Sequence, residues 1–339
     1  MTINVYILAL DSKGLLVDLE VLSKALNELS EKLDWKLSVQ AFVIHSKNLD
    51  AENSLLIEFP NDPHIIIHLQ QIYNLPNLKN KQAVQILVPN HEWFSDQTIS
   101  RLGLVKQLWH KTQTGFHLLE SLYSHNVVHR YLGFTSPDPG IRANNNNNFA
   151  HFKGKSSLRH TNLILNIWKK RSDFPELKIQ FWSAHEEISF FNVPEWFRWN
   201  NMSVRIGYLS RKEYFSELAL CGIHICTSMT EGFGHYINEA RAMGAVPMVI
   251  NAPPMNEFVD AESGILINPS GYMVNRDVTY FSIEESLLEQ AFESAKEISE
   301  LNLLKFGLNA RARYESERID FYKRLELEMI ELLEELDSL

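Results

Sequence analysis

Strand-like and helix-like patterns alternate along most of the 339 residues. This alternation is the feature that most strongly limits the fold that the chain can adopt. Short apolar runs rich in β-branched residues predict strands, and longer stretches with apolar residues at every third or fourth position predict helices. In the first half, the pattern predicts strands at residues 3–10, 37–44, 55–58, 64–68, 83–88 and 126–132. Helices are predicted at residues 17–33, 95–105 and 115–123. Such alternation is typical of an α/β fold with a parallel sheet covered by helices.

A stretch rich in Pro, Gly and Asn interrupts this alternation. Residues 135–140 lead into consecutive asparagines at residues 144–148, which predicts a flexible linker between two domains. The second half predicts strands at residues 149–152, 178–182, 204–207, 223–227, 246–250 and 264–267. A helix is predicted at residues 161–170, and a long helical region at 282–335 with an interruption near Gly307. Two such doubly wound halves predict two Rossmann-like domains.

The bulk composition agrees with two globular domains. A chain of 339 residues is long for one core, and its 45% apolar content is ordinary for a globular protein. No apolar run reaches the roughly 18 residues that a membrane span needs. Residues 1–10 lack a basic region and a cleavage site, so no signal peptide is expected. The two cysteines, Cys221 and Cys226, match no metal motif and are expected to be buried thiols in a reducing, cytoplasmic compartment.

The charge balance limits the classes of molecule that the protein is expected to bind. A formal net charge of −10 argues against a nucleic-acid-binding protein. It also gives no support to a broad basic face for membrane docking. The net charge does not exclude a local basic patch, and a peripheral membrane contact through such a patch is therefore an alternative.

Residues 230–242, Thr-Glu-Gly-Phe-Gly-His-Tyr-Ile-Asn-Glu-Ala-Arg-Ala, hold the strongest candidate ligand site. Gly232 and Gly234 carry no Cβ, so the backbone there can approach a ligand closely. The helix expected after them directs unpaired N–H groups and its positive dipole end at the same place, which suits an anion. Glu231 lies at the mouth of this turn, and Glu239 lies about a turn inside the helix. A nucleotide sugar, which joins hydroxyl groups to phosphates, is a ligand of this kind.

A basic segment at residues 153–161, Lys-Gly-Lys-Ser-Ser-Leu-Arg-His-Thr, follows the first strand of the second half. A nucleoside diphosphate is an anion, so its site needs cations. Lys155 and Arg159 can aim at one point if a turn lies between them. The Gly-Lys-Ser tripeptide lacks the upstream glycine of a P-loop, which excludes that motif. A solvated basic turn is the alternative.

Polar residues follow several strands of the first half. Gly14, after the first strand, would allow close approach of the backbone. No Gly-x-Gly-x-x-Gly occurs there, which disfavours a nicotinamide or flavin dinucleotide. Asn90, Glu92, Lys111 and Thr135 come near strand ends, where open α/β sheets bind ligands. For each of them, an ordinary structural role is the alternative.

The segment at residues 230–242 resembles the Glu-x7-Glu signature of retaining GT-B glycosyltransferases, most closely those of glycosyltransferase family 4. Residues 244–250 and 252–257 stand where that family has its next strand and its donor-side loop. The resemblance implies that Glu231 contacts hydroxyls of the sugar and that Glu239 holds the ribose of the nucleotide. It assigns the remaining donor contacts to Gly232, Phe233, Gly234 and His235, and to Gly14 near the reacting sugar.

Two further parts of the sequence extend this resemblance. Lys155 and Arg159 resemble the Gly-Arg…Lys-Gly pair of the family, with the two cation types exchanged. Residues 88–94, 109–112 and 133–136 resemble blocks of a subgroup of the family. These blocks imply an acceptor side formed by Asn90, Glu92, Lys111 and Thr135.

The resemblance implies a GT-B fold of two Rossmann-like domains that face a cleft. Residues 1–140 would form the N-terminal, acceptor-side domain, and residues 149–310 the nucleotide-sugar domain. Residues 311–339 would form a C-terminal helix that packs back on the first domain.

The expected function is that of a retaining glycosyltransferase of the hexosyltransferase type, with a nucleotide-diphosphate sugar as co-substrate and no other cofactor. No Asp-x-Asp and no metal-type His pair occurs, so no metal is expected. The helix dipole, Lys155 and Arg159 would stabilise the leaving diphosphate instead. The acceptor stays open among glycans, lipid-linked sugars and small molecules, and so does the route of retention. A nucleotide-sugar epimerase of the same fold and an inactive nucleotide-sugar-binding protein are the alternatives.

Overall fold

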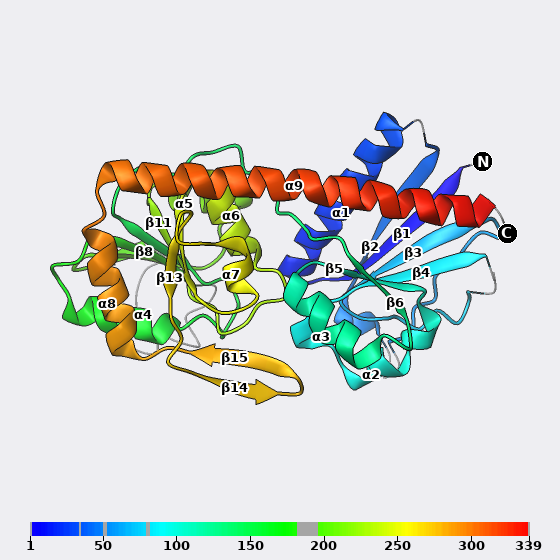
Figure 1. Ribbon diagram of the computed structural model, residues 1–339, viewed down its shortest axis with the longest axis horizontal. Coiled ribbons are helices and arrows are strands. Elements are labelled where there is room, and N and C mark those ends of the chain that lie inside the picture. Colours follow the sequence, from blue (N-terminus) through cyan, green and yellow to red (C-terminus); the bar gives the residue numbers. More distant parts are fainter. Residues whose placement is uncertain (1, 34, 50–52, 79–81, 182–195, 338–339) are drawn as a thin grey trace. The chain divides into compact units, whose positions relative to one another are not determined.

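The computed structural model describes residues 2–33, 35–49, 53–78, 82–181 and 196–337. The chain forms two compact units (Figure 1). Unit 1 comprises Met1–Pro137 and Glu317–Leu339, and unit 2 comprises Asp138–Ser316. Each unit is built on a parallel or mainly parallel sheet with helices, so the predicted α/β fold class is confirmed.

The sheet of unit 1 is parallel, in the order β2-β1-β3-β4-β5-β6. Its strands are β1 (Ile3–Leu10), β2 (Leu37–Ile44), β3 (His64–Leu69), β4 (Ala83–Val88), β5 (Gln107–His110) and β6 (Val128–Tyr131). The inner strand β3, His-Ile-Ile-Ile-His-Leu, is buried along its whole length, including its two histidines. The helices are α1 (Lys13–Lys32), α2 (Asp96–Ser100) and α3 (Gln113–Tyr123), with 3-10 turns η1 (Ser46–Asn48), η2 (His91–Trp93) and η3 (Leu102–Leu104).

The sheet of unit 2 has the order β13-β12-β11-β7-β8-β10-β9, and only β9 runs antiparallel to its neighbour. Its strands are β7 (Phe149–Phe152), β8 (Leu177–Phe181), β9 (Trp196–Trp199), β10 (Met202–Ile206), β11 (Ile223–Cys226), β12 (Val246–Ile250) and β13 (Ile265–Ile267). A separate hairpin consists of β14 (Gly271–Asn275) and β15 (Val278–Ser282). The helices are α4 (Thr161–Lys170), α5 (Arg211–Leu218), α6 (His235–Met243), α7 (Met255–Phe258) and α8 (Glu285–Lys296). The last residue of the strand predicted at 178–182 lies outside the described residues.

One predicted strand is wrong. Residues 55–58 form no strand, and Ser54 beside them makes only an isolated bridge with Asn74. Leu55 is buried in the core cluster that contains Tyr73, whereas Leu56 is 81% exposed. The apolar residues of this segment therefore supply packing to the core without adding a strand to the ladder.

Two further segments are shorter than predicted. The helix expected at residues 95–105 divides into α2 and the turn η3, because Arg101 leaves the helical conformation (φ −108°, ψ 5°). The strand expected at residues 126–132 is limited to β6, which follows its neighbour β5 only from Gln107 to His110.

The expected interruption near Gly307 is also wrong. The helix α9 (Glu300–Asp337) passes through Gly307 without a break, and the chain leaves the helical conformation earlier, between α8 and α9. A Cβ on Gly307 would lie 2.1 Å from the backbone oxygen of Gly244, the residue that ends α6 with a φ of +68°. The glycine therefore permits close contact between two helices of unit 2, rather than ending one of them.

We expect Gly307→Ala to lower the free energy of unfolding by about 1–3 kcal/mol, the usual cost of overpacking a dense contact. Alanine otherwise favours a helix over glycine by about 1 kcal/mol. The sign of the change, measured by urea denaturation, therefore tests the contact. Gly14→Ala is the matched control, because Gly14 also lies in a helix and no described atom lies within 4 Å of its added Cβ. A stabilising effect of both substitutions would contradict the close contact.

The asparagine run is not a free linker. The amide of Asn146 donates to the Leu220 oxygen (3.0 Å) and accepts from the Gly222 N–H (3.0 Å). The amide of Asn147 donates to the oxygens of Lys296 and Ile298, each at 2.9 Å. The run lies within unit 2, and its side chains form hydrogen bonds with backbone groups of that unit. The prediction of a flexible linker is therefore wrong for this segment.

The last part of α9 belongs to unit 1, as the GT-B resemblance implies. The ring of Phe321 packs against that of Phe134, with 5.1 Å between the centroids. Arg324 Nε donates to the Leu132 oxygen at 2.7 Å. These contacts attach the end of the chain to the segment that follows β6.

Candidate functional site

Two loops of unit 2, with the helix α6 that follows one of them, contain all the predicted donor-site residues except Gly14. One loop follows β7 and leads to α4, and the other follows β11 and leads to α6. Because β7 and β11 are neighbouring parallel strands, both loops leave the sheet at its carboxyl edge. Backbone contacts join them: the Met229 N–H donates to the Leu158 oxygen (2.8 Å), and Thr227 Oγ1 donates to the Arg159 oxygen (3.3 Å). Segments about seventy residues apart in sequence thus form one site.

Arg159 lies at the centre of this site. Its Nη1 donates to the Phe152 oxygen at 3.1 Å, and its guanidinium carbon lies 3.7 Å from the centroid of the Tyr236 ring. Burial has the largest single effect and opposes the charge, but the attraction of Tyr236, Glu231, Tyr214 and Cys226 together outweighs it, and the pKa of Arg159 is raised. The buried Nε has no hydrogen-bond partner among the described residues. The structure therefore holds a charged guanidinium in place with a donor unused.

Glu231 connects to this cation through two hydroxyl groups. Ser228 Oγ donates to Glu231 Oε1 at 2.6 Å, and the same hydroxyl bonds to the phenol of Tyr236. Tyr236 in turn lies under the guanidinium of Arg159. This chain orients the carboxylate at the start of the turn. The sequence analysis assigned no role to Ser228 or Tyr236, although both lie within a few residues of Glu231.

Glu239 lies in α6 and is partly buried. Tyr214 of α5 donates its hydroxyl to Glu239 Oε2 at 3.2 Å. Burial raises the pKa of Glu239, while His235 and Tyr214 oppose that change. Burial also raises the pKa of Tyr214 well above its usual value, so the phenol keeps the proton that it donates. No local pattern in the sequence indicated Tyr214, because it comes from a different helix.

The turn between the two glutamates needs a glycine. Gly234 has a φ of +81° and is the residue before α6, whose first residue is His235. A Cβ there would lie 3.1 Å from Ile237 Cδ1. Phe233 is 3% exposed and packs edge-on against Phe258, with 5.2 Å between ring centroids. Its side chain therefore anchors the turn in the core, and Gly232 beside it is buried as well.

Lys155 and Arg159 differ in solvent exposure. Lys155 is exposed and follows Gly154, whose φ is +62°. Arg159 is partly buried, with its guanidinium against Tyr236. The structure therefore places one of the two predicted cations in the cluster and the other on the surface of the same loop.

The predicted residues of unit 1 lie at the carboxyl edge of its own sheet. Gly14 is exposed in the first turn of α1, just after β1. Asn90 and Glu92 follow β4, and Asn90 Nδ2 donates to Gln70 Oε1 at 3.3 Å. Thr135, in the segment after β6, is buried. The expectation that strand ends collect polar side chains thus agrees with their placement here.

Lys111, after β5, takes part in a buried ion pair that sequence reasoning missed. Its Nζ lies 2.9 Å from Asp18 Oδ2, and both side chains are 3% exposed. Asp18 lies on the buried face of α1, between Leu15 and Leu22. The sequence offered one signal for this pair: Asp18 is an acidic residue at a helix position where the spacing predicts an apolar one. The pair holds the ammonium of Lys111 inside unit 1.

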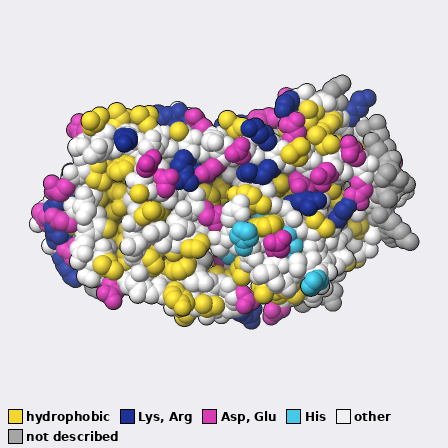
Figure 2. Space-filling view, viewed as in Figure 1, with side chains coloured by type: hydrophobic (Ala, Val, Ile, Leu, Met, Phe, Trp, Pro, Cys, Tyr) yellow, Lys and Arg dark blue, Asp and Glu magenta, His cyan; other side chains and the backbone are white. Residues whose placement is uncertain are grey.

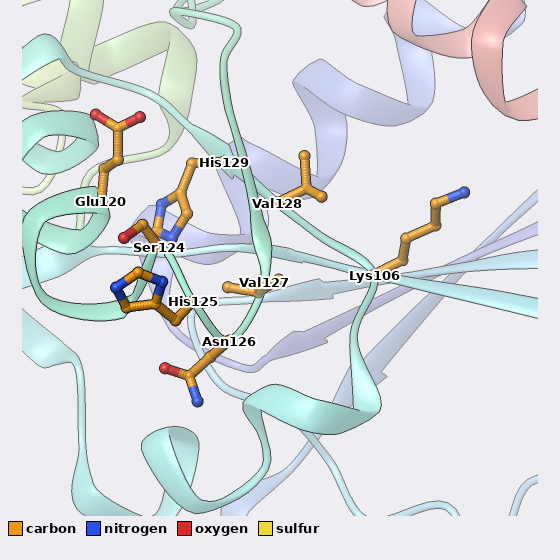
Figure 3. A pocket seen from close by; sticks show the side chains of 8 residues that line it. All are labelled: Lys106, Glu120, Ser124, His125, Asn126, Val127, Val128 and His129. Carbon is orange, nitrogen blue, oxygen red and sulfur yellow. The ribbon is translucent and has the colours of Figure 1, made fainter.

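Unit 1 also contains a pocket of about 420 Å³ away from these residues. It lies near the amino ends of β5 and β6, and Figure 3 shows Glu120, Ser124, His125 and His129 gathered on one side of it, with Lys106 pointing away. His129 Nδ1 lies 2.9 Å from His110 Nε2, and burial lowers the pKa of His110 to about 3. The imidazole pair is therefore neutral and internally bonded.

Among the described residues, no group of three or more His, Cys, Asp and Glu side chains is arranged to hold a metal ion. In the same part of the chain, no helix combines the length and the apolar character that crossing a membrane requires.

No protein-family model matches the chain, and no curated protein matches it. Solved structures match in fold. S. aureus TarM aligns with a TM-score of 0.56 and 14% identity over 78% of this chain, which spans only 56% of TarM. Sucrose-phosphate synthase from Thermosynechococcus elongatus aligns with a TM-score of 0.64 and 12% identity over 99% of both chains. Anabaena HepE aligns with a TM-score of 0.61 and 11% identity, over 98% of this chain and 100% of HepE.

At such low identities, the likeness shows the fold alone. The matched structures are GT-B glycosyltransferases, in which two Rossmann-like domains are built on separate sheets. Two sheets of this kind are present here, one in each unit. The chain therefore has the GT-B fold.

Proposed function

We propose that the protein is a retaining, metal-independent glycosyltransferase that moves a hexosyl group from a nucleotide-diphosphate sugar to an acceptor hydroxyl. One observation carries the proposal: Ser228 and Tyr236 link Glu231 to the charged Arg159 beside the glycine turn that precedes α6, and Glu239 lies within that helix. Neighbours of the same fold support it, since TarM was solved with UDP and a GlcNAc derivative, and HepE with UDP and glucose.

Each residue has a role that follows from its chemistry. Glu239, an acceptor of hydrogen bonds, would hold the ribose hydroxyls, and Glu231 would hold hydroxyls of the sugar. When the glycosidic bond breaks, its electrons pass to the diphosphate. The first N–H groups of α6 and the guanidinium of Arg159 would stabilise that charge. Lys155 would approach the same phosphates from the solvent side. No step then requires a metal ion.

Unit 1 would recognise the acceptor. Asn90, Glu92 and Thr135 lie at the carboxyl edge of its sheet, where parallel α/β sheets bind ligands. Lys111 would act there indirectly, because its ammonium is paired with Asp18. Gly14, exposed after β1, would allow backbone approach to the sugar.

A panel of nucleotides and nucleotide sugars tests the proposal first by thermal shift, since a ligand that binds only the folded state raises the melting temperature. Release of the nucleoside diphosphate from the best ligand is then measured with candidate acceptors and in excess chelator. We expect turnover in chelator equal to that with added magnesium. Epimerisation of the sugar when the nucleotide sugar is supplied without an acceptor would identify an epimerase instead. Loss of turnover in chelator and recovery with metal would contradict metal independence.

We expect Glu239→Gln to weaken donor binding by about 1.5–3 kcal/mol, the value of a charge-assisted hydrogen bond. That corresponds to roughly a tenfold to hundredfold rise in the dissociation constant, measured by titration calorimetry. Tyr214→Phe is the companion variant, because it removes the hydroxyl that donates a hydrogen bond to Glu239 and leaves the carboxylate in place. It should weaken binding less. Equal affinity of wild type and Glu239→Gln would exclude the ribose role.

A further inference from the structure

The β14–β15 hairpin of unit 2 stands apart from the sheets. Among the described strands, β14 and β15 pair only with each other. Arg276 and Asp277 connect them with φ values of +47° and +65°, as in a two-residue type I′ turn. Such a two-stranded hairpin is marginally stable by itself in water. It therefore gains stability from any surface that pairs with it.

One edge of the hairpin is already occupied. The Phe281 N–H of β15 donates to the Met229 oxygen at 2.8 Å, in the loop before Glu231. The residues that flank the turn, Asn275 and Val278, face each other. Counting from that hydrogen-bonded pair, pairs with and without hydrogen bonds between the two strands alternate along the hairpin. Phe281 lies opposite Tyr272 and directs its backbone groups outward. By the same alternation, Tyr272 and Val274 direct their N–H and C=O groups to the outer edge of β14.

This outer strand is strongly apolar and exposed. Tyr272 is 72% exposed, Met273 61% and Val274 57%. Consecutive strand residues point to opposite faces, so both faces of β14 present apolar side chains. Figure 2 shows apolar side chains gathered at the lower margin of unit 2, where Figure 1 places the hairpin. An exposed apolar edge of this kind is a template for pairing with another strand.

We propose that β14 pairs antiparallel with β14 of a second copy of this chain, about a two-fold axis at Met273. In this register, Tyr272 faces the partner's Val274, and these two residues exchange both of their outward backbone hydrogen bonds. Their side chains form an aromatic and β-branched cross-strand pair, which is a favourable combination. Met273 faces the partner's Met273 on the other side of the sheet.

The same register avoids repulsion at the ends of the strand. Gly271 faces the partner's Asn275, and the charged Arg276 and Asp277 lie in the turn beyond the paired residues, so no like charges meet within the paired strands. The outward backbone groups would suit any extended strand, whereas the side-chain pairs of this register are complementary to themselves. That property favours a second copy over an unrelated extended peptide. The result would be a four-stranded antiparallel sheet shared by two protomers, which is independent of the reaction proposed above.

A cysteine at the two-fold axis tests the register. A pair without direct hydrogen bonds, such as Met273 with the partner's Met273, has Cα atoms about 4.5 Å apart. That distance is within the roughly 4.4–6.8 Å that a disulfide requires. Met273→Cys should therefore give a reducible covalent dimer under mild oxidation. The native Cys221 and Cys226 are buried and free, so they should not contribute.

Asn275→Cys is the matched control on the same face of the same strand. In the proposed register, the two copies of this position are offset along the strands by about four residues, or about 14 Å at about 3.4 Å per residue. They should not cross-link. Equal cross-linking of both variants, or none in Met273→Cys, would overturn the pairing.

Light scattering of the unmodified protein gives a second reading. We expect a species of twice the 39.3 kDa chain mass at high protein concentration. Val274→Pro removes an outward N–H but no bond within the hairpin, so it should return the protein to a monomer. Leu301→Asp, at another exposed apolar residue (75%), should not. A wild type that stays monomeric at every concentration, or that co-sediments with neutral lipid vesicles as a monomer, would overturn the proposal.

Discussion

Lys111→Met will lower the free energy of unfolding by about 3–5 kcal/mol, because it leaves a buried carboxylate without its counter-charge. Lys111 Nζ and Asp18 Oδ2 lie 2.9 Å apart, and both side chains are 3% exposed. Water cannot replace the lost partner at that degree of burial. Chemical denaturation of the purified chain measures the change.

Two comparisons separate this effect from a general cost of mutation. Lys24→Met breaks an exposed pair with Glu28 (3.7 Å) and should cost less than about 1 kcal/mol. The double variant Asp18→Leu with Lys111→Met should recover much of the loss, since an apolar pair of similar volume often replaces a buried ion pair without cost. A Lys111→Met variant as stable as Lys24→Met would show that the pair is not buried in solution.

Arg159→Ala is expected to reduce turnover about 10²–10³-fold in the proposed reaction, the usual effect of removing one positioned donor to developing charge. The guanidinium is placed by the Phe152 oxygen and the Tyr236 ring, and its buried Nε has no hydrogen-bond partner among the described residues. The rate constant with saturating nucleotide sugar measures the effect. The melting temperature is recorded alongside it, because the side chain also contributes to packing.

Lys155→Ala is the matched comparison, because it removes the same charge from an exposed position of the same loop. Its effect on turnover should be clearly smaller. Arg159→Lys keeps the charge but loses the planar contact with Tyr236, and its turnover should fall between that of the wild type and that of Arg159→Ala. Near-normal turnover of an Arg159→Ala protein that melts normally would remove Arg159 from the site.

Local periodicity was sufficient to predict most of the sheet strands. The bounds of β1, β2, β4, β7 and β12 agree with those read from the sequence, because each is rich in apolar residues and is followed by polar or turn residues. Residues 55–58 were misread for the same reason, since an apolar run does not by itself indicate hydrogen bonding to a neighbouring strand. Neither β9 nor the β14–β15 hairpin was predicted. β14 has no buried face, and the pattern for a strand depends on one.

The glycines show a similar division. The positive φ of Gly234 agrees with the turn that its sequence context predicts. Gly307 was read as a helix break, although it lies within α9 against Gly244. A glycine that ends a helix and one that admits a neighbouring backbone look the same in sequence. Only the packing of another element tells them apart.

The sequence by itself determined the α/β class, most strand positions and the proximity of Glu231 to the glycine turn, because these depend on residues within about a dozen positions of one another. The tertiary structure alone decided that Tyr214 bonds to Glu239, that Arg159 lies on Tyr236 and that Asp18 pairs with Lys111. The order of strands in a sheet brings together loops that are distant in the chain, and no local pattern of residues encodes that order.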